Sequence, residues 1–124
     1  MPNFEDLLEE KAGDADKEQR LINSALVRFR KQMPELTQSF MNFWRESKKG
    51  KSIPLKMKEL MALGIVITMK CKPCIFLHTK ICLEIGATME EILETAGVAL
   101  SMGGGPVYEY IGYVIEAIEF YKKK

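Results

Sequence analysis

Apolar residues recur every three or four positions along most of this chain, and this helical spacing limits the fold more than any other feature. The clearest stretch runs through residues 21–29. The spacing is interrupted where a proline suits the first turn of a helix, at Pro34, Pro54 and Pro106, and where a glycine suits a helix end, as at Gly86. We therefore predict an all-α fold, a compact helical domain of about six or seven helices.

The boundaries of the predicted helices follow from these signals. In the N-terminal half, the predicted helices are a short one with Phe4, Leu7 and Leu8 that ends near Gly13, one through residues 21–29, and one that begins at Pro34. Next come a helix over residues 55–69 and one from near Cys71 to Gly86. The last two are a helix that begins at Thr88 and ends at Gly103–Gly105, and one that begins at Pro106. Thr88 and Glu91 have the spacing of a capping box, in which each satisfies a free backbone N–H of the other.

The helix over residues 55–69 is apolar on nearly every side. A helix of this kind is expected to be buried all round, so we predict that it is the central helix of the fold. We interpret the methionines as core packing, among them Met33, Met41, Met57, Met61 and Met69. The aromatic residues of the last helix are likewise expected to pack in the core and at an interface; they are Tyr108, Tyr110, Tyr113 and Phe120.

Length and charge limit the organisation and the partners. With 124 residues the chain has the size of one domain, predicted to cover residues 1–124. A net charge of +1 lacks the basic excess that phosphate binding needs, so we expect no nucleic acid partner. The longest apolar run, Leu60–Met69, is ten residues, too short to cross a bilayer, and the N-terminus lacks the features of a secretory signal. We therefore predict a cytoplasmic protein with no membrane partner.

The three cysteines, Cys71, Cys74 and Cys82, lie within 12 residues of one another, and His78 lies among them. At about 100° per residue on an α-helix, all four side chains share one face roughly 80° wide. In a reducing compartment such a cluster indicates redox or metal chemistry more than a structural disulfide framework. A CxxC motif at a helix N-terminus favours redox chemistry, because free N–H groups and the helix dipole stabilise a thiolate.

A zinc site is the alternative interpretation of the same cluster. Four ligands on one straight helix span about 16 Å and cannot close a tetrahedron. Two or three of them at most can bind one ion, and a second helix or subunit must then supply the rest. The sequence has no second histidine and no second CxxC, so we predict no metal. Cys82 is expected to be a small buried hydrophobic residue.

Glu59 is the second informative residue, because it lies on an apolar stripe of its predicted helix, with Leu63 and Val66 among its neighbours. Either Lys56 or Lys58 could be a structural partner for it. Otherwise burial raises the pKa of its carboxyl group and suits Glu59 to proton transfer. A base, an imidazole and two thiols would then form a complete relay, provided that they meet in the fold.

These motifs together resemble the carboxymuconolactone decarboxylase and alkylhydroperoxidase D (AhpD)-like family. The resemblance rests on Glu59, on Cys71-x-x-Cys74 twelve residues later and on His78 after three more residues. The Glu-Leu-Met-Ala-Leu stretch from Glu59, the cap at residues 86–91 and the Met-Gly-Gly-Gly-Pro turn at residues 102–106 add to it. It covers roughly residues 33–120.

The resemblance implies an all-helical fold in which the CxxC opens a helix and the glutamate faces it from the preceding helix. It implies that Cys71 and Cys74 cycle between dithiol and disulfide, with Glu59 and His78 relaying the proton that activates a thiol and with no cofactor. The substrate would be a hydroperoxide or a disulfide, and a peroxiredoxin or dithiol protein would be the electron-transfer partner. Family members are usually trimers or hexamers, which implies a homo-oligomer.

This chain departs from AhpD in two respects. It has the size of the shorter relatives, and it carries Pro73 where AhpD has a second histidine inside its CxxC. A thiol-disulfide oxidoreductase with peroxidase activity is the preferred hypothesis, and either Cys71 or Cys74 can be the attacking thiol. The alternatives are a carboxymuconolactone decarboxylase-type enzyme, in which Glu59 and His78 do acid–base chemistry on a lactone, and a non-catalytic helical assembly module that binds a metal through its thiols.

Overall fold

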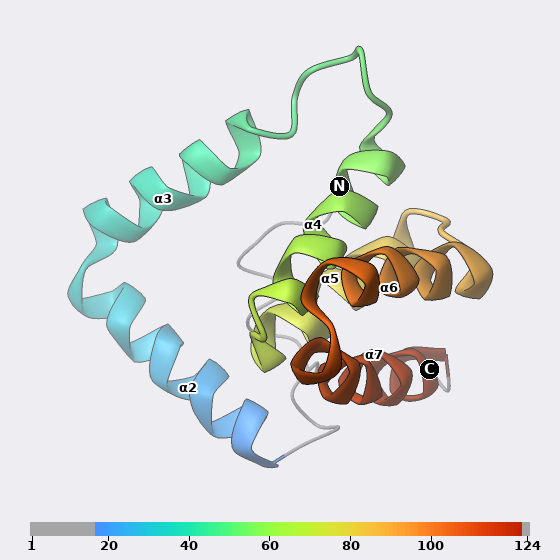
Figure 1. Cartoon of the computed structure of the whole chain (residues 1–124). Coiled ribbons are helices and arrows are strands. Elements are labelled where there is room, and N and C mark those ends of the chain that lie inside the picture. The colour runs from blue at the N-terminus through green and yellow to red at the C-terminus, as the bar shows by residue number, and fades with distance from the viewer. Residues whose placement is uncertain (1–16, 123–124) are drawn as a thin grey trace. The chain divides into compact units, whose positions relative to one another are not determined.

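A computed structural model of the chain describes residues 17–122, and in this range the regular structure is entirely helical. The predicted all-α fold is therefore confirmed. The helices are α2 (Lys17–Gln32), α3 (Pro34–Glu46), α4 (Leu55–Thr68), α5 (Lys72–Glu84), α6 (Met89–Gly103) and α7 (Gly105–Lys122) (Figure 1). The predicted short helix with Phe4, Leu7 and Leu8 lies outside the described residues. No helix among residues 17–122 combines the length and the apolar character that crossing a membrane would take.

The chain forms two compact units that join between Leu55 and Lys56. The first contains α2 and α3, which are consecutive helices separated at Met33. Pro34 lies in the first turn of α3, as predicted, and the Thr37 hydroxyl donates to the carbonyl oxygen of Met33 at 2.8 Å. The single domain that we expect from the chain length stays a prediction.

The second unit contains α4 to α7 and holds the larger core. In this unit α7 packs against both α5 and α6 (Figure 1). Every one of the four helices contributes fully buried apolar side chains, among them Leu63, Ile67, Ile75, Ile92 and Val114. These side chains fill the space between the helices and thereby fix the positions of α4 and α5, which carry the residues of interest.

The start of α5 lies near Cys71, as the sequence predicted. Lys70 has a positive φ of 57°, and Cys71 is the extended N-cap residue of the helix. Pro73 lies in the first turn, where its missing N–H costs no hydrogen bond. This sharp turn after α4 places the whole CxxC motif at the N-terminal end of α5.

The capping box of α6 is also confirmed. The backbone N–H of Thr88 donates to Oε1 of Glu91 at 2.8 Å, and the backbone N–H of Glu91 donates to the Thr88 hydroxyl at 3.1 Å. Two N–H groups that the first turn of a helix leaves free are thereby satisfied.

The prediction that α4 is buried all round is wrong. Its buried side chains, Glu59, Leu60, Leu63 and Ile67, lie on one side of the helix. The exposed side chains of this region are Met57, Met61, Ile65 and Met69. The prediction that the methionines pack in the core is therefore wrong for Met57, Met61 and Met69, and also for Met33, which is exposed. It is right for Met41, which is buried. An apolar helix surface has two physical explanations, burial in the core or contact with a partner, and the sequence pattern does not separate them.

Candidate active site

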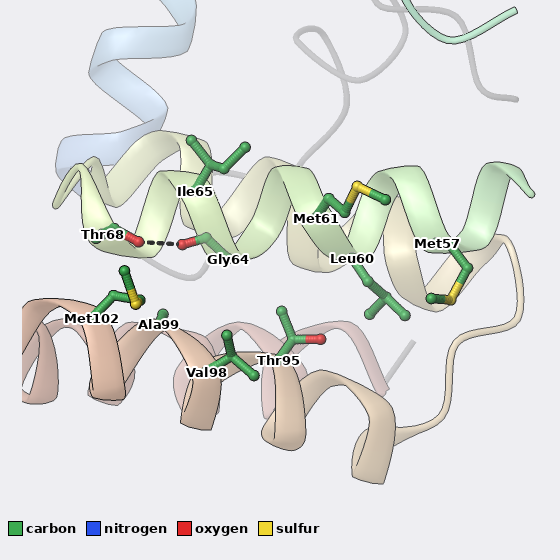
Figure 2. A pocket seen from close by; sticks show the side chains of 10 residues that line it. All are labelled: Met57, Leu60, Met61, Gly64, Ile65, Thr68, Thr95, Val98, Ala99 and Met102. Atoms are coloured by element: carbon green, nitrogen blue, oxygen red, sulfur yellow. Dashed lines mark hydrogen bonds between the residues drawn. The ribbon is translucent and has the colours of Figure 1, made fainter. Parts of the chain in front are cut away.

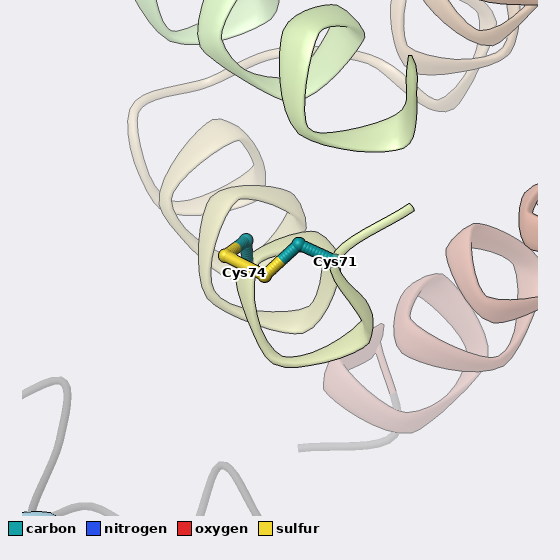
Figure 3. The surroundings of a disulfide bond; sticks show 2 residues. All are labelled: Cys71 and Cys74. Atoms are coloured by element: carbon teal, nitrogen blue, oxygen red, sulfur yellow. A yellow bond between two sulfur atoms is a disulfide. The ribbon is translucent and has the colours of Figure 1, made fainter. Parts of the chain in front are cut away.

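Cys71 and Cys74 are joined by a disulfide at the start of α5 (Figure 3). Their Cα atoms are 5.3 Å apart, within the usual range for bonded cysteines. Both residues are partly exposed. One helical turn thus holds the two sulfurs within bonding distance of each other, while a reactant in solution still has access to the pair.

Positive charge lies at the start of α5, where the disulfide is. Cys71 precedes the first turn of a 13-residue helix, and its side chain makes no capping hydrogen bond. The N-terminal N–H groups of such a helix carry a partial positive charge. Lys72 adds a full positive charge within the motif, and its ammonium lies 5.0 Å from the centre of the Tyr113 ring.

Glu59 and His78 meet in the core between α4 and α5. Nδ1 of His78 lies 3.2 Å from Oε1 of Glu59. The Glu59 side chain is 0% exposed and the His78 residue 8% exposed. A buried carboxylate is costly to ionise unless a donor or a cation is held against it, and here the imidazole fills that position. A proton can therefore move between these two groups without reaching solvent.

Lys56, one of the two lysines considered as a partner for Glu59, pairs with a different acid. Its ammonium lies 2.9 Å from Oε2 of Glu91, so it joins the start of α4 to the start of α6. The carboxyl group of Glu59 instead contacts His78.

The disulfide and His78 lie on the same helix, α5. His78 follows Cys74 by four residues, which is about one turn and roughly 6 Å along the helix axis. Cys82 lies one turn further on; it is outside the disulfide and fully buried. The arrangement offers an oxidisable pair at the surface and, one turn inside, an imidazole and a carboxyl group that can exchange a proton.

Among the described residues, no group of three or more His, Cys, Asp or Glu side chains is placed to hold a metal ion. The two cysteines of the motif are bonded to each other, and His78 is engaged with Glu59.

Sequence reasoning missed the contact between Lys72 and Tyr113. The packing role predicted for Tyr113 is present, because its ring lies 5.4 Å from that of Tyr110 in an edge-to-face arrangement. Its contact with the ammonium of Lys72 joins α7 to the first residue of α5. A lysine inside a CxxC is visible in the sequence, but a partner on another helix is not.

Comparison with known proteins places these features in a family context. The family model described as the carboxymuconolactone decarboxylase family matches residues 34–111. The structure also resembles a crystal structure of the apo form of a carboxymuconolactone decarboxylase family protein from Legionella pneumophila, with a TM-score of 0.79 and 36% identity, over 90% of this chain and 96% of that one.

A second solved structure is a carboxymuconolactone decarboxylase family protein from Thermotoga maritima, for which a role in an antioxidative response has been suggested. Its TM-score is 0.69 at 28% identity, over 86% of this chain and 95% of that one. Among proteins known by sequence, one from Cupriavidus necator is 30% identical over 73 residues, 59% of this chain and 65% of its own length. One from Methanocaldococcus jannaschii is 32% identical over 77 residues, 62% of this chain and 72% of its own. Both are uncharacterized.

Proposed function

The chain belongs to the carboxymuconolactone decarboxylase family, and from this premise we propose that it is a thiol–disulfide oxidoreductase with alkylhydroperoxidase-like activity. The observation that carries the proposal is the Cys71–Cys74 disulfide at the N-terminus of α5, with Lys72 between the two cysteines. The family includes members without redox chemistry, and the intact, partly exposed cysteine pair is what favours the redox branch.

The proposed reaction begins with the dithiol form. A thiolate of the pair attacks the outer oxygen of a hydroperoxide, the O–O bond breaks, and the leaving alkoxide takes a proton to become an alcohol. The attacking cysteine is now a sulfenic acid. The second thiol of the pair attacks its sulfur, water leaves, and the disulfide forms. The pair has lost two electrons and the hydroperoxide has gained them.

Glu59 and His78 would accept and donate the protons in these steps. Activation of the thiol requires a base, and the alkoxide requires an acid; an imidazole held by a carboxyl group can serve both in turn. The buried contact at 3.2 Å supports this role because it fixes one ring nitrogen of His78 on Glu59. The other ring nitrogen of His78 would then exchange protons with the thiol and the alkoxide.

A dithiol protein partner would close the cycle by reducing the disulfide, whereas a peroxiredoxin partner would take electrons from the dithiol form. An external thiolate attacks the Cys71–Cys74 disulfide, a mixed disulfide forms, and the second external thiol resolves it, so that the partner leaves oxidised. Such a cycle requires a compartment rich in reduced thiols, and we therefore propose that the protein acts in the cytoplasm.

The test is consumption of an organic hydroperoxide with dithiothreitol as the dithiol. We expect turnover beyond one equivalent of protein, and one dithiothreitol oxidised for each hydroperoxide reduced. Turnover without any dependence on the dithiol would contradict the proposal.

A decarboxylase-type enzyme is the second candidate, and the Glu59–His78 contact favours it because an acid–base pair could act on a lactone without the thiols. Replacement of both Cys71 and Cys74 by serine distinguishes the two candidates. Acid–base turnover of a lactone would survive this double change, whereas hydroperoxide turnover would not.

A further inference from the structure

An open apolar groove lies between α4 and α6, with a cavity volume of about 460 Å³. Leu60 of α4 and Thr95 and Val98 of α6 point into the space between the two helices (Figure 2). The groove is also lined by Ile65 and Met102. Ile65, Val98 and Met102 remain 58%, 66% and 78% exposed.

A surface with these properties is characteristic of a binding site for another helix. Monomeric proteins rarely leave large apolar side chains exposed together, because each costs free energy in water. Three methionines line this groove, Met57, Met61 and Met102. Methionine side chains are flexible and adapt to the shape of an apolar partner.

The same chain carries a helix of matching character. Ile22, Leu26, Phe29 and Met33 follow one another at four-, three- and four-residue spacing, so they form one stripe along α2 and its end. All four side chains are exposed. Helices with such a stripe dock into apolar grooves through residues at this spacing.

Charge favours a contact between α2 and the groove. The sequence of α2 contains five basic residues and one acidic residue, whereas that of α6 contains three glutamates and no basic residue. Glu94 precedes Val98 by one helical turn and therefore lies at the edge of the groove. Opposite charges around an apolar contact speed association and fix its orientation.

We propose that α2 of a second copy of this chain docks in the groove between α4 and α6, so that the protein assembles through two different surfaces of each chain. This proposal does not depend on the thiol chemistry. Glu59 follows Met57 by two residues, about 200° around α4, and thus lies on the side of the helix away from the groove.

The test is the mass of the full chain by light scattering, under reducing conditions and over a range of protein concentrations. We expect the wild-type protein to have at least twice the monomer mass of 14.1 kDa. Val98→Asp places a carboxylate in the groove and Leu26→Asp places one on the α2 stripe. Each variant should raise the dissociation constant at least about tenfold. Association should also weaken as salt is added.

The decisive step is to mix the two variants. The Val98→Asp chain keeps an intact α2 and the Leu26→Asp chain keeps an intact groove, so the mixture should regain an assembly that neither variant forms alone. Leu93→Asp is the matched control, because Leu93 is an exposed leucine of α6 that does not line the groove. Circular dichroism checks that each variant is helical; Met102→Asp replaces Val98→Asp if that chain does not fold.

Four results would overturn the proposal. The first is a wild-type mass of 14.1 kDa at every concentration, which would leave the groove empty or filled from within one chain. The second is dissociation by Val98→Asp alone, which would mean that the groove meets a surface other than α2. The third is a mixture that stays monomeric. The fourth is dissociation by Leu93→Asp as strong as that by Val98→Asp.

Discussion

Nδ1 of His78 lies 3.2 Å from Oε1 of Glu59, although the two residues are 19 positions apart and belong to different helices. Neither side chain has more than a small exposed fraction. A polar contact at this depth is maintained only if each group satisfies the other. It also places an acid–base pair about one helical turn from Cys74.

Glu59→Gln should lower hydroperoxide turnover about 10²-fold or more, the usual contribution of a positioned acid–base group. Glutamine keeps the shape of the side chain and an acceptor oxygen for His78, but it cannot carry the proton. The measurement is the steady-state rate with dithiothreitol as reductant. Glu94→Gln, at an exposed position of α6, is the matched control and should leave the rate unchanged. A Glu59→Gln variant as fast as wild type would remove Glu59 from the relay.

Cys71→Ser and Cys74→Ser should each abolish hydroperoxide turnover, because one cysteine forms the sulfenic acid and the other resolves it. Cys82→Ser should leave turnover largely intact, because this thiol is fully buried and outside the disulfide. The measurement is again dithiol-dependent hydroperoxide consumption. Equal loss from Cys82→Ser would show that the assignment of the pair is wrong.

Replacing either of two glycines of α6 by alanine should change the free energy of unfolding, in opposite directions for the two positions. A Cβ at Gly97 meets no atom within 4 Å, so Gly97→Ala should raise the free energy of unfolding by about 0.5–1 kcal/mol. A Cβ at Gly103 would collide with the Val107 side chain, so Gly103→Ala should lower it by about 1–3 kcal/mol. Urea unfolding measures both. A stabilising Gly103→Ala would contradict the close approach of α6 and α7 at this point.

The capping box makes part of the stability dependent on pH. The N–H of Thr88, and next to it the ammonium of Lys56, lower the pKa of Glu91 below its ordinary value of 4.5. The carboxylate therefore stabilises the folded state above that value, and the contribution is lost as the pH falls through the lowered pKa.

Glu91→Gln tests this linkage, because glutamine keeps the capping hydrogen bond and loses the charge. Thermal unfolding should find the variant less stable than wild type at neutral pH, and the difference should disappear well below pH 4.5. Glu90→Gln, one residue earlier, is the control and should show a smaller change. A difference that persists in acid would mean that the charge of Glu91 is not its source.

The sequence predicted well those features that depend on neighbouring residues. The turn into α5, with Pro73 in the first turn, and the capping box of Thr88 and Glu91 both follow from local backbone chemistry, and both are present. The position of the CxxC at a helix N-terminus was therefore predictable from the residues alone.

Contacts between helices were not predictable in the same way. The contact of Glu59 with His78 was expected only through the family resemblance, and that of Lys72 with Tyr113 was missed, because each depends on how two helices pack. The exposed side of α4 was missed for a different reason. Hydrophobicity alone does not tell whether Met61 faces a core or a partner.

The most direct test of the redox proposal is to map the thiols by mass spectrometry before and after one equivalent of hydroperoxide. We expect the reduced protein to start with three cysteines in the thiol form and to end with a Cys71–Cys74 disulfide and Cys82 still a thiol, without loss of helical structure. A protein that keeps all three thiols after the hydroperoxide is added, or that forms a disulfide through Cys82 instead, would contradict the proposal.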